Sequence, residues 1–412
     1  MIQLAVEENN ENLGAKLKVI GVGGAGGNAV NSMINSREIE SVEFLAANTD
    51  AQALTMSLAQ TKIQLGAKIT KGLGAGSKPE VGKRAAEEDL DLITEKISQA
   101  DILFLTAGFG GGTGSGALPV IAKAAKDIGV LTVAVVATPF NFEGKKRLTH
   151  AQEAINNLKN AVDTIIIVPN QKLLEQADPK ISMLDAFALS DEVLKNAVKG
   201  ISDIITRAGH INVDFADVKE VMKDMGMAIM GVGRAEGEDR AKKAVLQAIH
   251  SPLLEDISIN GAKGVLINIT GNIDLGLHEI NEAATIVHDM VSEDAQIILG
   301  SVIDPSMGSQ IMVTVIATGF ESKKEEYKPA VAAQDKPILV SKEAVKEPQV
   351  LFEPKFDKVE KNAENLEENL YAQSFDLNDV DTPTFLRKKA EEDAYRNFSE
   401  NNDNTNNNKL EL

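Results

Sequence analysis

Residues 17–30 read LKVIGVGGAGGNAV, a short apolar run that leads directly into a cluster of glycines. Gly21, Gly23 and Gly26 spell G-x-G-x-x-G between a predicted strand and a predicted helix, the context of a dinucleotide-binding fingerprint. Glycines let the backbone approach a phosphate, and a helix N-terminus adds a favourable dipole. Two interpretations stand at this point: a site for NAD or FAD, as in a nicotinamide oxidoreductase, or a tight turn with a purely structural role.

A second glycine loop favours a different ligand. Residues 106–120 read TAGFGGGTGSGALPV, with six glycines within 108–116 where one would suffice for a turn. The loop also carries two hydroxyl side chains at the predicted start of a helix, a combination that makes an anion nest. A third glycine turn lies at 72–76. Three such loops predict one long polyphosphate that is held at several points.

Two expected partners of common phosphate sites are missing from the sequence. The acidic residue that NAD binding needs about 20 residues after the fingerprint is not in place, because Asp50 comes too late. A Walker loop is excluded too, since LGAGSK has Ser77 where that motif requires lysine. With no lysine placed to neutralise the phosphates, we expect Mg²⁺ as the counter-charge and assign it no protein ligand.

Composition narrows the functional class. The formal net charge of −19 argues against nucleic-acid binding and against direct docking on anionic lipid, both of which need cationic patches. No apolar run reaches 18 residues and the N-terminus has no secretory pattern, so we expect neither a membrane span nor export. The absence of cysteine removes thiol catalysis and fits a cytoplasmic protein.

Apolar runs and helical patterns alternate along the chain, which predicts an α/β fold with a parallel sheet covered on both faces. A helical pattern from 181 to 207 is long enough to cross a whole domain, and a smaller α/β unit follows it. The strand candidates are 17–22, 42–47, 102–107, 131–137 and 164–168, then 264–270, 295–303 and 310–318 in the second unit. The helix candidates are 79–99, 115–128, 239–250 and 277–292.

Several motifs together resemble one family. GGGTGSG at 110–116 is similar to the signature loop of the tubulin superfamily. In order and spacing, the whole set resembles the FtsZ family of bacterial cell-division GTPases over roughly residues 16–320. The set also contains GVGGAGGNAV, NTDAQAL (48–54), GLGAG (72–76), PFNFEGKKR (139–147), NVDFAD (212–217) and SPLLED (251–256).

The resemblance implies a domain plan. It implies a Rossmann-like GTP-binding domain joined by a long central helix to a smaller α/β domain that activates hydrolysis, with a disordered C-terminal tail. The expected divisions are a lead-in at 1–15, the GTP-binding domain at 16–180, the central helix at 181–208, the C-terminal domain at 209–320, a disordered linker at 321–375, a partner-binding peptide at 376–390 and a disordered tail at 391–412.

The resemblance also implies which residues bind GTP or GDP. Two glycine loops would cradle the phosphates, a charged pair would contact the ribose and phosphate region, and three residues would meet the base. These residues are Gly24, Ala25, Gly26, Gly27 and Asn28, then Gly111, Gly112, Thr113 and Gly114, then Glu143 and Arg147, and finally Asn170, Phe187 and Asp191. A carboxylate at Asp191 that accepts two guanine N–H groups would favour G over A.

The segment HINVDFADVKEVM raises the catalytic question. Asp217 followed by Glu220 has the spacing of a capping box, so a structural role is open for Asp217. In the family this segment inserts into the nucleotide site of the neighbouring subunit. That implies that Asp214 and Asp217, with Asn212 nearby, orient the attacking water, and that hydrolysis requires head-to-tail assembly into filaments.

The resemblance places the protein at the mid-cell division ring. The tail sequence DVDTPTFLRKK suits coupled folding onto a membrane-tethering partner protein. Two alternatives remain at this stage: a non-catalytic scaffold gated by nucleotide, and an NAD-dependent oxidoreductase.

Overall fold

The computed structural model describes residues 14–320 except 208, 210, 252 and 254–258. The predicted linker, partner-binding peptide and tail, and nearly all of the lead-in, lie outside these residues. In the described part of the chain, no helix is long and apolar enough to cross a membrane.

Six parallel strands form the first half of the sheet, in the order β3-β2-β1-β4-β5-β6. The apolar runs of the central strands are buried, as expected for a parallel sheet that helices cover on both faces. The strands are β1 (Leu17–Val22), β2 (Val42–Asn48), β3 (Thr61–Gln64), β4 (Ile102–Gly108), β5 (Leu131–Thr138) and β6 (Thr164–Pro169).

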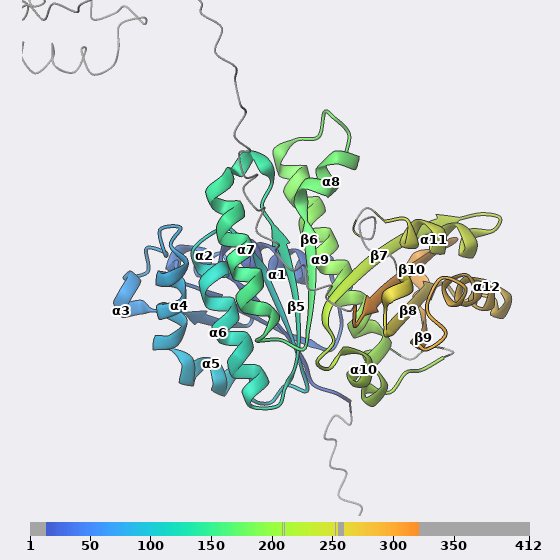
Figure 1. Ribbon diagram of the computed structural model, residues 1–412, viewed down its shortest axis with the longest axis horizontal. Coiled ribbons are helices and arrows are strands. Elements are labelled where there is room, and N and C mark those ends of the chain that lie inside the picture. The colour runs from blue at the N-terminus through green and yellow to red at the C-terminus, as the bar shows by residue number, and fades with distance from the viewer. Residues whose placement is uncertain (1–13, 208, 210, 252, 254–258, 321–412) are drawn as a thin grey trace, which may run out of the picture. The chain divides into compact units, whose positions relative to one another are not determined.

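Helices cover both faces of this sheet (Figure 1). One apolar cluster joins the sheet to α1 (Gly23–Ser36) and the other joins it to α6 (Thr113–Asp127) and its neighbours. The remaining helices of this half are α2 (Ala51–Thr55), α3 (Ala67–Thr70), α4 (Pro79–Glu88), α5 (Leu90–Ile97), the 3-10 turn η1 (Asn141–Glu143), α7 (Lys145–Lys159) and α8 (Asn170–Gln176).

The long helix α9 (Met183–Thr206) packs on the same side as α1 and leads to the second half of the molecule. The elements after α9 are α10 (Phe215–Met222), β7 (Gly226–Glu236), α11 (Arg240–Ile249), η2 (Ile259–Gly261), β8 (Gly264–Gly271), α12 (Leu277–His288), β9 (Gln296–Ile303), η3 (Pro305–Met307) and β10 (Gln310–Thr318). A third apolar cluster lies between the β7-β10-β8-β9 strands and helices α11 and α12.

The two halves share one sheet. Strand β7 pairs in parallel with β6 over residues 164–166, so the sheet has ten strands in all. Beyond β7 the pairing changes: β10 is antiparallel to β7 and β8, and β9 is parallel to β8. The second unit is therefore a mixed extension of the parallel sheet.

The predicted elements differ from the structure in three places. Strands β3 and β7 were not predicted, because β3 buries a single side chain over four residues and glycines interrupt the apolar pattern of β7. The predicted helix 79–99 is two helices, α4 and α5, which meet at Asp89. The carboxylate of Asp89 accepts the Gly66 N–H at 2.6 Å, and its backbone leaves the helical conformation there.

Candidate nucleotide site and acidic segment

The glycine segments after β1 and β4 lie at the point where the strand order reverses. Strands β1 and β4 are neighbours, while β2 and β5 continue the sheet in opposite directions. In open α/β sheets the carboxyl ends of such a strand pair form the ligand crevice.

Helix α1 begins at Gly23, so residues 24–28, expected as a loop, are its first turns. The loop expectation was wrong, because the helix starts directly after the strand.

The N-termini of α1 and α6 both carry free backbone donors. Neither helix has a capping side chain that accepts from its first N–H groups, and neither has an acidic residue in its first turn. A Cβ atom on Gly23 would lie 3.0 Å from the Gly114 nitrogen, so the two helix ends are adjacent. Two unsatisfied helix N-termini at one place make an anion-binding site.

The glycines here fall into two groups. A Cβ on Gly26 would lie 2.4 Å from the Thr106 carbonyl oxygen, and one on Gly114 would lie 2.7 Å from the Gly108 oxygen, so both positions serve close packing. A Cβ on Gly24, Gly27 or Gly111 would meet no atom within 4 Å. The open glycines leave space beside the backbone, where a phosphate can approach. Ala25 and Asn28 are exposed on the same turns of α1.

The third glycine loop joins the other two. A Cβ on Gly112 would lie 2.8 Å from the Ala75 side chain and equally close to the Lys78 nitrogen. The Thr113 hydroxyl, at the first residue of α6, lies 2.7 Å from the Thr49 hydroxyl at the end of β2. The structure thus brings together the three segments that the sequence predicted to meet around one ligand.

Glu143 and Arg147 lie beside this group and bind each other. They form an ion pair between the end of η1 and the first turn of α7, and the Glu143 carboxylate also accepts the Phe140 N–H at 3.0 Å. A Cβ on Gly110 would lie 3.1 Å from the Arg147 Cβ, which places the pair next to the second glycine loop.

The three predicted base contacts gather at the start of α9. The Phe187 ring is 39% exposed and packs edge-on against Phe140 at 5.3 Å, so it is not ordinary helix core. Asn170 is buried, and its side-chain oxygen accepts the Ser190 hydroxyl at 2.8 Å. Burial raises the pKa of the neighbouring Asp191 carboxyl to about 6. Above this pKa the half-buried carboxylate is mostly ionised and can accept N–H groups from a ligand.

The acidic residues lie at the other end of α9. Asp214 is the N-cap position of α10, yet its side chain makes no capping bond there. Asp217 is the third residue of α10, so the expected capping box that begins at Asp217 was wrong: the helix starts three residues earlier. Both carboxylates are exposed. The Asn212 side chain accepts the Gly209 N–H at 2.8 Å.

The length of α9 separates the two sets of residues. Its 24 residues span about 36 Å at 1.5 Å per residue. Phe187 and Asp191 lie on the first turns of α9, Asn170 lies at the start of α8, and residues 212–217 follow the last turn of α9. Figure 1 shows α8 near the top of the view and α10 near the bottom. The acidic residues are therefore not brought to the glycine loops of the same chain.

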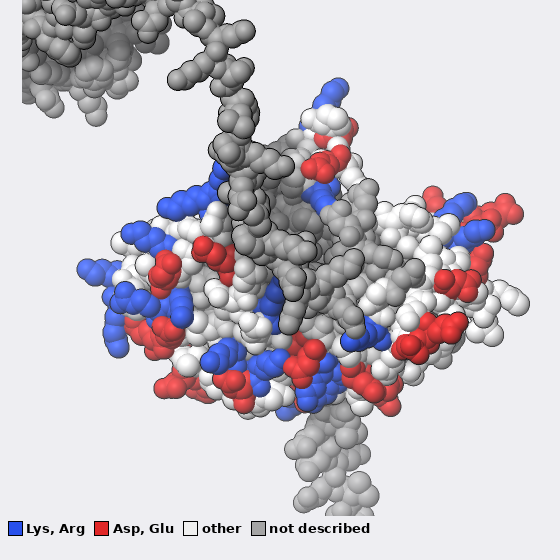
Figure 2. Space-filling view, in the orientation of Figure 1, with Lys and Arg blue, Asp and Glu red and all other residues white. Residues whose placement is uncertain are grey.

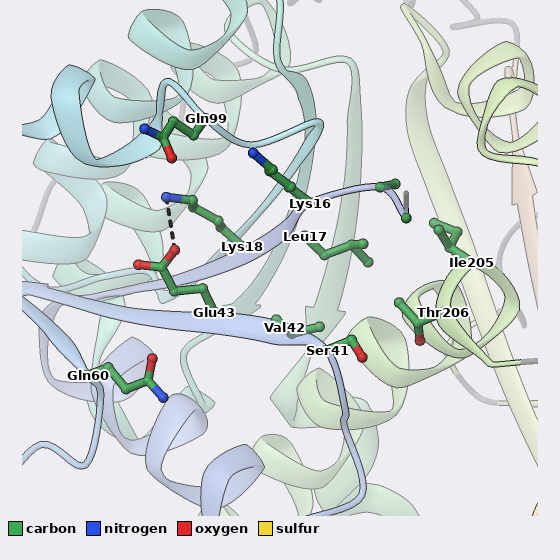
Figure 3. Close-up of a pocket in the computed structure, with 12 residues that line it drawn as sticks. Lys16, Leu17, Lys18, Ser41, Val42, Glu43, Gln60, Gln99, Ile205 and Thr206 are labelled. Atoms are coloured by element: carbon green, nitrogen blue, oxygen red, sulfur yellow. Dashed lines mark ion pairs between the residues drawn. The ribbon is translucent and has the colours of Figure 1, made fainter. Parts of the chain in front are cut away.

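A pocket of about 530 Å³ lies at the acidic end of α9 and not at the glycine loops. Figure 3 shows Leu17 and Val42, which begin β1 and β2, facing Ile205 and Thr206 at the end of α9. The Lys18 ammonium that points into this region is already paired with Glu43 at 3.0 Å. Figure 2 shows acidic and basic side chains interspersed along the lower rim of the visible face.

Sequence reasoning missed three residues that support the site: Thr49, Phe140 and Ser190. Thr49 lies in the NTDAQAL motif and Phe140 in the PFNFEGKKR motif, so the motifs located both segments without indicating these roles. Ser190 carries no recognisable signal, since only the fold reveals its bond to Asn170.

Comparison with known proteins agrees with this arrangement. Residues 16–178 match the model of the Tubulin/FtsZ family GTPase domain, and residues 226–321 match that of the FtsZ family C-terminal domain. Among solved structures, the chain is similar to an FtsZ from M. jannaschii described as an empty dimer, at 45% identity and a TM-score of 0.72, over 75% of this chain and 89% of that one. A tryptophan-to-tyrosine mutant of the M. jannaschii protein gives the same identity and TM-score and is covered over 92% of its length.

A more distant likeness concerns the fold alone. CetZ1 from Haloferax volcanii is 22% identical with a TM-score of 0.65, over 74% of this chain and 95% of that one. With two adjacent family domains matched and a 45% identical relative covered almost entirely, the chain belongs to the FtsZ family of tubulin-like GTPases.

Proposed function

We propose that this chain binds GTP at the three glycine loops and hydrolyses it only after head-to-tail assembly into filaments of a cell-division ring. The observation that carries the proposal is the separation along α9. Asp191 lies 15 residues before the end of α9, about 22 Å along the helix axis, and Asp214 and Asp217 lie beyond that end. The two aspartates would therefore serve a nucleotide only in another subunit. A contact between two different faces of a subunit does not close, and it builds a filament.

Each set of residues has a role in this proposal. The open N–H groups of α1 and α6 hold the phosphates, and Thr113 supplies a hydroxyl beside them. Phe187 stacks on guanine while Asp191 and Asn170 bind its polar edge. Glu143 and Arg147 exchange part of their mutual pairing for ribose and phosphate contacts. Asp214 and Asp217 of the adjoining subunit polarise the attacking water, with Asn212 holding the segment.

Magnesium is part of this proposal. No group of three or more His, Asp or Glu side chains in the described residues could hold a metal ion alone. The ion would therefore depend on the phosphate oxygens, and the Thr113 hydroxyl, at the first residue of α6, would supply a protein oxygen beside them. Mg²⁺ supplies charge neutralisation at the β- and γ-phosphates.

The cellular role is inferred from the family. An FtsZ dimer among the relatives supports self-association. We extend this to filaments at mid-cell in a bacterial cytoplasm, where the peptide 376–390, outside the described residues, would bind a membrane-tethering protein. Neither nucleic acid nor the membrane itself is a proposed partner, given the net charge of −19.

The test is phosphate release measured together with light scattering over a range of protein concentrations. Turnover per subunit should rise above a threshold concentration, at which scattering also appears. Asp214→Ala should keep GTP binding and assembly but lose turnover by 100-fold or more. Constant specific activity at high dilution would overturn the assembly requirement. GTP binding without any phosphate release would instead identify a non-catalytic scaffold.

A further inference from the structure

A cluster of charged side chains surrounds the last turns of α9. Lys199 and Asp203, one turn apart on the helix, are both buried and lie 2.7 Å from each other. Arg207, the residue that ends the helix, lies 3.4 Å from Asp203 through its Nε atom. Asp304, which follows β9, completes the cluster. Two cations thus face two carboxylates in a region with little access to water.

Arg207 connects three parts of the chain. Its Nη2 atom donates to the Glu38 carbonyl oxygen at 3.0 Å and to the Glu40 carboxylate at 3.2 Å, both in the turn between α1 and β2. Its Nη1 atom donates to the Asp304 carboxylate at 3.2 Å, beyond β9. One guanidinium therefore joins the nucleotide-binding half, the central helix and the C-terminal half. Lysine could not make these contacts together, because it lacks the planar fork of donors.

Packing at this end of α9 is incomplete on one side. The 530 Å³ pocket of Figure 3 lies between the end of α9 and the first residues of β1 and β2, with Ser41 and Thr206 on its wall. Ser41 directly follows Glu40 in the sequence, and Thr206 directly precedes Arg207. The pocket is therefore lined by residues next in sequence to two members of the Arg207 contacts.

The acidic segment is tied to the same strand that precedes Asp304. The Ile211 N–H donates to the Ser301 hydroxyl at 2.9 Å, and the Ser301 N–H donates to the Ile211 carbonyl at 3.2 Å. Ser301 is buried in β9, three residues before Asp304. Arg207 before the segment and Ile211 within it are thus anchored to one end of β9.

We infer that Arg207 is a positioning residue for hydrolysis: by binding Glu40 and Asp304, it sets the direction in which Asp214 and Asp217 leave the end of α9. This inference rests on the proposed function, since the aspartates must reach a nucleotide in the next subunit. Small displacements at the base of a segment move its tip, and catalytic rates fall steeply with misplacement of about 1 Å.

The test compares turnover per assembled subunit among folded variants. Arg207→Lys keeps the charge but not the three-way contact. Glu40→Gln removes the negative charge from one of these contacts, at an exposed side chain, without touching the buried carboxylates. Arg234→Gln is the matched control, because Arg234 also pairs with α9, through Glu192 at 3.9 Å, but on the solvent-exposed surface. For each variant we would measure GTP affinity of the dilute subunit, polymer mass by sedimentation and phosphate release from the polymer.

We expect Arg207→Lys to lower the turnover number of the polymer at least fivefold and Glu40→Gln two- to threefold. GTP affinity and polymer mass should stay within twofold of the parent chain, and Arg234→Gln should change none of the three. Parent-like turnover in both variants would overturn the inference. A loss of GTP affinity and polymer mass that parallels the loss of turnover would also overturn it, because Arg207 would then stabilise the fold and not position the aspartates. If the parent chain itself shows no assembly-dependent turnover, it is the proposed function that fails.

Discussion

The hydroxyl oxygens of Thr49 and Thr113 lie 2.7 Å apart and join the end of β2 to the first turn of α6. Thr49 is fully buried, whereas Thr113 is partly exposed at the helix end where the phosphates are proposed to bind. The Thr49 hydroxyl therefore fixes the position of a side chain that is proposed to face the phosphates. This contact links the NTDAQAL motif to the glycine loop of α6.

Replacing Thr113 with valine should test that link. The change removes one hydroxyl at constant shape and leaves the buried Thr49 hydroxyl without this partner, so we expect the free energy of unfolding to fall by about 1 kcal/mol. GTP affinity should fall about tenfold, because a donor beside the phosphates is lost. Chemical denaturation and nucleotide titration measure the two effects. Thr94→Val is the control, since Thr94 is half-buried in α5 and its hydroxyl donates to the Leu90 carbonyl oxygen of the same helix; an equal affinity loss there would contradict the assignment.

The two groups of glycines in α1 should respond in opposite ways to alanine. Gly26→Ala places a Cβ 2.4 Å from the Thr106 carbonyl oxygen, so α1 and β4 must separate. We expect this variant to lose about 1–3 kcal/mol of stability, the usual cost of overpacking. Gly24→Ala meets no atom within 4 Å and should be neutral or stabilising by up to about 1 kcal/mol.

Nucleotide binding then separates a structural glycine from one that faces the phosphates. Gly24→Ala should weaken GTP binding by about tenfold or more despite its intact fold, because its methyl group would occupy the space beside the backbone N–H groups. Thermal unfolding and GTP titration on the same samples measure both quantities. Parent-like GTP affinity in a stable Gly24→Ala variant would remove this turn of α1 from the site.

Asp214 should be dispensable for stability, unlike another aspartate at the same kind of position. Asp50 is the N-cap of α2, and its carboxylate accepts from the Gln52 and Ala53 N–H groups. Asp214 holds the N-cap position of α10 without such a bond. We therefore expect Asp50→Ala to cost about 1 kcal/mol and Asp214→Ala less than about 0.5 kcal/mol. Denaturant midpoints decide this, and a cost at Asp214 equal to that at Asp50 would favour a structural role for Asp214.

The sequence predicted most of the strands and the glycine segments at the proposed nucleotide end of the molecule. Consecutive apolar strands and glycine loops carry their own signals, because a buried parallel strand needs a continuous apolar run and a close phosphate approach needs glycine. Strand β7 was not predicted, because glycines take the place of the branched side chains that are typical of a strand. Its pairing with β6 also depends on residues far away in the sequence. The Arg207 contacts with Glu40 and Asp304 span up to 167 positions along the chain, so no local pattern could indicate them.

Asp191 should make nucleotide binding depend on pH near neutrality. Burial raises the pKa of its carboxyl to about 6, so the group gains a proton as the pH falls through 6 and then no longer accepts both guanine N–H groups. GTP affinity should therefore fall about tenfold between pH 7 and pH 5, as the ionised fraction drops to about a tenth. Titrations with GTP across this range measure the effect. Asp191→Asn should bind weakly at every pH, and an unchanged pH profile in that variant would assign the titration to another group.

The same carboxyl should lower the stability of the nucleotide-free protein at neutral pH. Because its pKa in the folded state lies above the usual value of 3.8, the folded state holds the proton more tightly than the unfolded state does. The stabilisation from that proton is complete below about pH 3.8 and is lost as the pH rises through 6. Asp191→Asn removes this penalty, so we expect it to raise the free energy of unfolding at pH 7 by about 1–2 kcal/mol after solvent screening. Higher stability together with weaker GTP binding would mark Asp191 as a residue kept for its ligand, whereas lower stability at pH 7 would contradict that role.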